Sequence, residues 1–202
     1  MNGNSKASSM LKRLSVLIIP AAGLLLTASL RAQDTNLCAS LVMTRLEAAQ
    51  TNIGRVTIRA TFPVGTILAR TGSVTVNCKE ITDIPSGQKD QGIAITVTEG
   101  EQSTDIALID YDELDPLLDA LDYLNKVDWS VTTLSSFDAF YTTKDGFRMA
   151  AFSSRRTGII EFVVRTLRYN QRPVFFARDQ VAQFRTLIQQ AKAKLDSVRP
   201  AK

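Results

Sequence analysis

The chain has 202 residues, with 24 Lys and Arg, 20 Asp and Glu, and no histidine. The lack of histidine excludes Ser-His-Asp and Cys-His catalysis and removes the commonest transition-metal ligand. The sequence also contains no phosphate-binding loop, no G-x-G-x-x-G and no G-x-S-x-G. These absences favour a non-enzymatic binding or protein-interaction module over an enzyme, and no catalytic residue, cofactor or resident metal is assigned.

The first 32 residues have the pattern of a secretory signal peptide. Residues 1–13 carry three cations and no acid, and residues 14–30 are apolar and uncharged. Cleavage is expected after Ala32, with Ser29 as the second choice. The alternative is a retained membrane anchor, but 17 apolar residues are short for about 30 Å of hydrocarbon. The sequence therefore predicts a periplasmic or extracellular domain over 33–202, with membrane contact only through the signal segment before cleavage.

Removing the signal segment changes the net charge. Four cations and no acid precede the cleavage site, so the mature chain carries 20 cations and 20 anions. The basic character of the precursor is therefore no evidence for nucleic-acid binding, and no nucleic acid is expected as a partner.

The chain has two cysteines, Cys38 and Cys78. An oxidising compartment permits a disulfide between them, and a Cys38–Cys78 bridge is predicted on that ground. The alternative is two unrelated buried thiols. Lipidation of Cys38 is not expected, because Asn36 and Leu37 are not the small residues that a lipoprotein box requires.

The first half of the mature chain reads as a short helix followed by strands. The helix is expected over 41–49 and the strands over 55–62, 66–70, 73–81, 93–99 and 104–109. Pro63 and Gly65 mark a turn between the first two strands, and 84–91 is a polar loop.

A central amphipathic helix follows these strands. Its apolar positions recur at the i, i+3, i+4, i+7 spacing: Leu114, Leu117, Leu118, Leu121 and Leu124. The Asp115–Pro116 pair predicts a helix over 116–127, because Asp caps free amides and Pro suits the first helical position. A capping-box start at Asp110 with Glu113 competes with it. The leucine face requires a sheet to cover it.

The second half repeats the order of strands and helix. Strands are expected over 137–143, 147–153, 159–168 and 173–177, and Asp-Gly at 145–146 predicts a hairpin between the first two. Asp179 is expected to cap the closing helix. The helix has an apolar face made of Val181, Phe184, Leu187, Ile188, Ala191 and Leu195.

The two halves, 54–128 and 135–199, match at an offset of 67 residues, with Leu117 opposite Phe184. The connections are too short for parallel crossovers, so the predicted class is α+β with largely antiparallel sheets and a possible duplicated unit of four strands and a helix. This doubled plan is similar in topology to that of the plant Whirly single-stranded-DNA-binding proteins. None of their motif residues is placed here, and an export signal argues against a DNA ligand.

Residues 99–128 carry ten acids against one lysine. A calcium site built from Asp110, Asp112, Glu113 and Asp115 is one interpretation, but the spacing does not fit an EF-hand. Helix capping and a solvated face explain the same residues. A carboxylate- or metal-dependent hydrolase is the enzyme alternative.

Residues 144–202 carry thirteen cations against four acids. Three interpretations stay open. The charges form solvated faces, they join the halves of one molecule or two subunits of a homodimer, or they bind an anionic partner. Arg148, Arg155, Arg165 and Arg168 are the candidates for such an anion-binding face.

Overall fold

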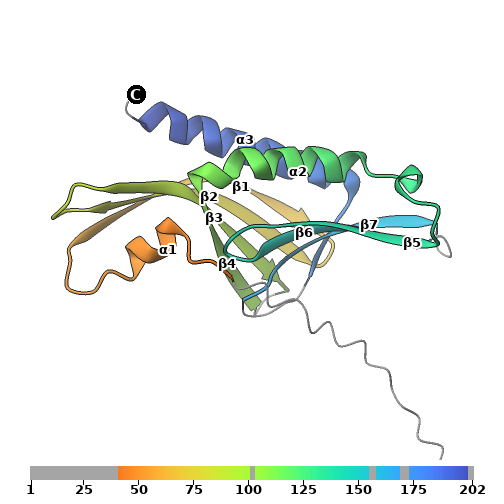
Figure 1. Ribbon diagram of the computed structural model, residues 1–202, viewed down its shortest axis with the longest axis horizontal. Helices are drawn as coiled ribbons and strands as arrows, with labels where there is room; N and C mark the ends of the chain where they lie inside the picture. Colours follow the sequence, from red (N-terminus) through yellow and green to blue (C-terminus); the bar gives the residue numbers. More distant parts are fainter. Residues whose placement is uncertain (1–40, 101–102, 155–157, 169–172, 200–202) are drawn as a thin grey trace, which may run out of the picture. The chain divides into compact units, whose positions relative to one another are not determined.

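In the computed structural model, residues 41–100, 103–154, 158–168 and 173–199 are described (Figure 1). The chain forms two antiparallel four-stranded sheets, each followed by a long helix. The first sheet has the order β1 (Thr57–Ala69), β2 (Gly72–Asp83), β3 (Lys89–Glu99), β4 (Ser103–Asp110), and the second has β5 (Ser136–Thr142), β6 (Phe147–Ser154), β7 (Ile159–Thr166), β8 (Val174–Phe176). The helices are α1 (Arg45–Gln50), α2 (Leu114–Lys126) and α3 (Arg178–Val198), with 3₁₀ turns at Tyr111–Glu113 and Trp129–Val131. The predicted α+β class and the doubled order of four strands and a helix are confirmed.

The first strand differs from its prediction. Two strands separated by a turn were expected, but β1 is one strand that pairs with β2 along its length. Its register shifts between Pro63 and Gly65. A proline without an N–H is tolerated on an edge strand, and a bulge absorbs the extra residue. A Cβ on Gly65 would lie 2.7 Å from Leu187 Cδ2, so α3 crosses β1 closely at this bulge.

Both long helices begin earlier than predicted. A 3₁₀ turn leads into α2, which starts at Leu114 and not at Pro116. Pro116 is accepted there because the first turn of a helix has no intrahelical partner for its amides. Helix α3 starts at Arg178, and the side chain of Gln180, not Asp179, accepts the N–H of Ala177 at 2.9 Å. Its neighbour Asp179 lies in the first turn, beside the positive end of the helix dipole.

One hydrophobic core joins both sheets and both long helices. The apolar faces predicted for the helices are confirmed: every member is buried except Leu118 and Leu187, which are partly buried against the core. The sheets contribute mainly the residues Val74, Val76, Ile93, Ile95, Ile109, Phe147, Met149, Ala151, Phe162, Val164, Val174 and Phe176. A second, smaller core lies where α1 packs, and it consists of Leu46, Ala49, Ile81, Ala94 and Leu108.

The helices contact the sheet of the opposite half. Helix α3 packs against β1, β2 and β3 of the first sheet and also against β7 and β8. Helix α2 packs against α3 and has β5 of the second sheet as its principal strand neighbour. The two halves are therefore packed into each other and share the larger of the two cores.

Ion pairs join α2 to α3 in antiparallel orientation. Arg185 binds Asp122 at two points, with Nε–Oδ1 at 2.6 Å and Nη2–Oδ2 at 2.8 Å. Near the other ends, Lys192 Nζ lies 3.5 Å from Asp115 Oδ1. The opposite charges of the acidic and basic regions thus meet within one chain. Pairing of two subunits through such charges stays a prediction.

Candidate functional site

A cavity of about 460 Å³ lies beside α1 on the outer face of the first sheet, the face opposite α3. Because alternate residues of a strand share a face, the register places Asn77, Ala94 and Leu108 side by side across three strands. The sheet residues at the cavity are Asn77, Lys79, Ala94, Thr96, Ile106 and Leu108, and the other lining residues are Glu47, Gln50, Thr51, Asp145 and Arg168.

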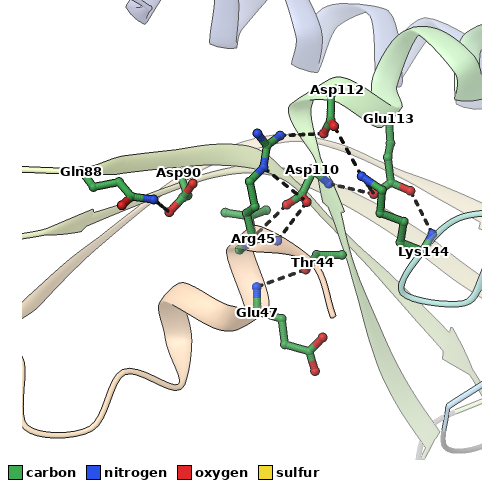
Figure 2. Close-up of polar contacts among 10 residues, drawn as sticks. Thr44, Arg45, Glu47, Gln88, Asp90, Asp110, Asp112, Glu113 and Lys144 are labelled. Carbon is green, nitrogen blue, oxygen red and sulfur yellow. Dashed lines mark hydrogen bonds and ion pairs between the residues drawn. The ribbon is translucent and has the colours of Figure 1, made fainter. Parts of the chain in front are cut away.

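Acidic residues from the end of β4 hold α1 in place (Figure 2). Asp110, only 2% exposed, accepts the backbone N–H groups of Arg45 at 2.9 Å and Leu46 at 3.1 Å. Thr44 Oγ1 accepts the N–H of Glu47 at 3.1 Å. These bonds satisfy the free amides at the start of a six-residue helix and place Glu47 at the wall of the cavity.

Glu113 connects the end of β4 to the turn between β5 and β6 (Figure 2). Its buried carboxylate accepts the N–H of Lys144 at 2.9 Å and that of Asp110 at 3.4 Å. Burial raises the pKa of Glu113, and the bonds from Lys144 oppose that shift. The turn that carries Asp145 is thereby fixed against β4.

Glu47, Asp145 and Arg168 form a charged group at one wall of the cavity. The guanidinium of Arg168 binds the Glu47 carboxylate at two points, 2.5 and 2.9 Å, and its Nε is paired with Asp145 Oδ1. Asp145 is 4% exposed, and its Oδ2 accepts the N–H of Leu108 at 2.5 Å. Burial raises the pKa of Asp145 to about 6, although the Leu108 bond and Arg168 act to lower it.

The cavity lining carries equal numbers of positive and negative side chains, and it has both polar and apolar groups. Its two carboxylates, Glu47 and Asp145, are matched by two cations, Lys79 and Arg168. The floor offers the amide of Asn77 and the hydroxyl of Thr96 beside the aliphatic side chains of the sheet. Such a surface suits a small polar molecule without net charge, because hydrogen-bond donors and acceptors are present while neither sign of charge is in excess.

The predicted arginine face is only partly assembled. Arg148 and Arg165 are cross-strand neighbours on β6 and β7. The side chain of Arg148 is buried, with its guanidinium 4.5 Å from the centre of the Phe140 ring and its Nε bonded to Thr142 Oγ1 at 2.8 Å. Arg168 lies at the cavity instead, against Glu47 and Asp145. Arg155 is outside the described residues.

The four candidate calcium ligands have other partners. Asp110 and Glu113 accept backbone amides, as described above. Asp112 binds Arg45 at 2.6 Å and Lys144 at 3.4 Å, and Asp115 pairs with Lys192 of α3. Within the described ranges, no three Asp, Glu, Cys or His side chains converge as metal ligands would. These carboxylates hold α1, the β5–β6 turn and α3 in position.

Cys78 is buried on the face of the first sheet that α3 covers. Its Sγ lies 3.5 Å from the carbonyl oxygen of Ala191, to which it donates, and burial raises its pKa. The other half of the predicted bridge, Cys38, lies outside the described residues, so the bridge stays a prediction.

The sequence alone does not identify most residues of the cavity. Strand alternation alone places Asn77 and Lys79 on one face, but it does not indicate which face is open. Glu47, Asp145 and Arg168 come from three distant parts of the chain, and no local spacing connects them.

A search of protein-family models, of curated proteins and of solved structures gives no match to this chain. In the described part of the chain, none of the helices combines the length and the apolar character that a membrane crossing requires.

Proposed function

We propose that the protein is an exported, non-enzymatic binding module that holds a small polar molecule without net charge in the cavity beside α1. The observation that carries this proposal is the cavity itself, about 460 Å³ in volume, with polar groups converging from sheet, helix and turn. Ligand sites in proteins are typically hollows of this size with a few placed polar groups.

The walls of the cavity are fixed before any ligand arrives. Asp110 holds α1, Glu113 holds the β5–β6 turn, and Arg168 connects Glu47 to Asp145. A preformed site loses little conformational entropy on binding. Because both carboxylates are already paired with Arg168, their role in this proposal is to position the wall and not to act as acid and base.

The proposal is tested by titrating ¹⁵N-labelled protein, lacking residues 1–32, with D-glucose, glycerol or glycine while recording amide spectra. Succinate and putrescine serve as charged comparators. We expect at least one uncharged or zwitterionic probe to shift the amide signals of Asn77, Thr96 and Ile106 together. If none of the three does so, or if a charged comparator gives the larger shifts, the proposal is wrong.

A matched pair of variants locates the site. Thr96→Phe fills the cavity and is expected to abolish the shifts. Thr98→Phe changes the next position on the same face of β3, which does not line the cavity, and is expected to retain them. Equal loss in both variants would show that the probe does not bind in the cavity.

Export is part of the same proposal and has its own test. Intact mass of the protein recovered from the periplasm or the medium is expected to show cleavage after Ala32. Thiol titration of that material, denatured without reductant, is expected to find no free thiol if Cys38 and Cys78 are bridged. Two free thiols would rule out the bridge.

A further inference from the structure

An apolar groove of about 180 Å³ lies between the last turns of α3 and the paired strands β1 and β2. It is on the α3 side of the first sheet, whereas the cavity beside α1 is on the other side, and Lys79 is the one lining residue that the two share. Buried Cys78 and Leu195 line its inner part and connect it to the hydrophobic core. Phe62 and Val198, 47% and 50% exposed, form its outer part.

Two lysines line this groove, Lys79 and Lys194. Lys79 Nζ donates to Thr61 Oγ1 at 2.9 Å, and Lys194 extends from the last turns of α3. Of the four cations on α3, Arg185 and Lys192 pair with carboxylates, and Arg178 donates to backbone carbonyls of 125 and 127. Lys194 has no carboxylate partner in the described part of the chain, and its Nζ lies 4.8 Å from the centre of the Phe62 ring.

The acid among the residues that line the groove is Glu80, and its carboxylate has other partners. Glu80 Oε1 lies 3.3 Å from Lys89 Nζ, and Glu80 Oε2 accepts from Gln91 Nε2 at 2.5 Å. An anion placed beside Lys194 therefore meets an available ammonium group and no unpaired carboxylate. The apolar groove and the unpaired cation together select a molecule with a hydrocarbon chain and a single negative group.

We propose that this groove binds a free fatty acid, with the chain against Ala60, Phe62 and Leu195 and the carboxylate at Lys194. Transfer of the hydrocarbon chain from water into the groove favours binding, and the carboxylate forms a charge-assisted hydrogen bond with Lys194. The site does not depend on the small-molecule cavity and adds a second ligand class to the protein.

Calorimetry with hexanoate, heptanoate and octanoate tests how much the hydrocarbon chain of the ligand contributes to binding. We expect affinity to rise about fourfold with each added methylene, the factor that corresponds to burying one such group. Octylammonium, with the same chain and the opposite charge, is expected to bind at least tenfold more weakly than octanoate. Absence of octanoate binding, or equal binding of octylammonium, would overturn the proposal.

Three variants test the placement of the ligand. Lys194→Gln is expected to weaken octanoate binding about fivefold, the size expected of one partly exposed ion pair. Ala60→Phe fills the groove and is expected to abolish binding. Lys126→Gln, an exposed lysine of α2 that does not line the groove, is the control and is expected to change nothing. Binding that survives Ala60→Phe, or that is indifferent to Lys194→Gln, rules out this site.

Two further measurements separate this proposal from its alternatives. Octanoate binding to Thr96→Phe is expected to be unchanged, so failure of the cavity proposal and failure of this one are distinguishable. Sedimentation with phosphatidylglycerol vesicles is expected to leave the protein in the supernatant. Sedimentation with vesicles, without binding of free octanoate, would assign the groove to a membrane surface and overturn the proposal.

Discussion

The carboxylate of Asp110, at the end of β4, accepts the backbone N–H of Leu46 at 3.1 Å, across 64 residues of sequence. The helix that begins there has only six residues, and a helix of that length is not stable alone in water. The position of α1, and with it one wall of the cavity, therefore depends on an acid from the opposite end of the first sheet's sequence.

Replacing Asp110 with Asn is expected to lower the free energy of unfolding by about 1–2 kcal/mol, because a buried charged cap becomes a neutral one. Amide exchange at Leu46 and Ala49 is expected to speed up more than exchange in β3. The control is Asp112→Asn, whose side chain is exposed and which is expected to change stability by less than about 0.5 kcal/mol. Equal effects of the two substitutions would contradict this account of α1.

The free energy of unfolding is expected to fall as pH rises from about 4 to 6. Asp145 has a native pKa of about 6 against an ordinary value of 3.8, so in that interval the native state binds more protons than the unfolded state. The decrease from Asp145 is about 2–3 kcal/mol and is nearly complete about one pH unit above its native pKa. Glu113, whose pKa is also raised by burial, adds to it.

Urea unfolding at a series of pH values measures this dependence. Asp145→Asn keeps an acceptor for the N–H of Leu108. In this variant, the free energy of unfolding is expected to fall less steeply with pH, because only Glu113 still contributes to the slope. The pKa of Asp122 is lowered by Arg185, so the stability that Asp122 contributes is lost only as pH falls below its ordinary value of 3.8 and does not enter this interval. The same slope in the variant and the natural protein would show that Asp145 is not its source.

The Asp122–Arg185 pair is expected to have a coupling energy of about 0.5–1 kcal/mol, because both side chains are partly exposed and screened by water. A double-mutant cycle with Asp122→Ala and Arg185→Ala in low salt measures it, and the coupling is expected to shrink in 1 M NaCl at a screening length of about 3 Å. Coupling that is unaffected by salt would mean that the pair acts through packing.

Leu117→Ala is expected to destabilise the protein by about 2–5 kcal/mol, because it leaves a cavity at a fully buried position. Leu118→Ala, at the adjacent and only partly buried position of α2, is expected to cost less than half as much. Thermal or urea unfolding of the two variants compares them. A larger loss in Leu118→Ala would mean that the helix is rotated from the orientation described here.

Periodic features of the sequence predicted the fold well. The leucines of α2 and the apolar face of α3 repeat at helical spacing, and that spacing alone identifies the buried side. The Asp-Gly hairpin is confirmed, with Gly146 at a φ of 84°. The offset of 67 residues pairs Leu117 with Phe184, and both are fully buried at corresponding places after their sheets.

Features that depend on tertiary contacts could not be predicted from the sequence. Pro63 and Gly65 indicate a turn locally, but pairing with β2 carries the strand through them as a bulge. The charge of Arg168 makes it a candidate from the sequence, whereas its partners Glu47 and Asp145 can be identified only when α1 and the β5–β6 turn are placed side by side. The groove at Phe62 likewise requires knowledge of where α3 ends.

The way α3 lies across the first sheet has a consequence for how the molecule is made. The strands that it covers are synthesised first and the helix last, so β1 to β3 expose an apolar face until nearly the whole polypeptide is available. A nascent chain that ends after its first repeat therefore has no stable folded state. Folding is expected to occur in one late step. Under the proposed export, such a delay would keep the polypeptide unfolded until it has passed through a translocation pore.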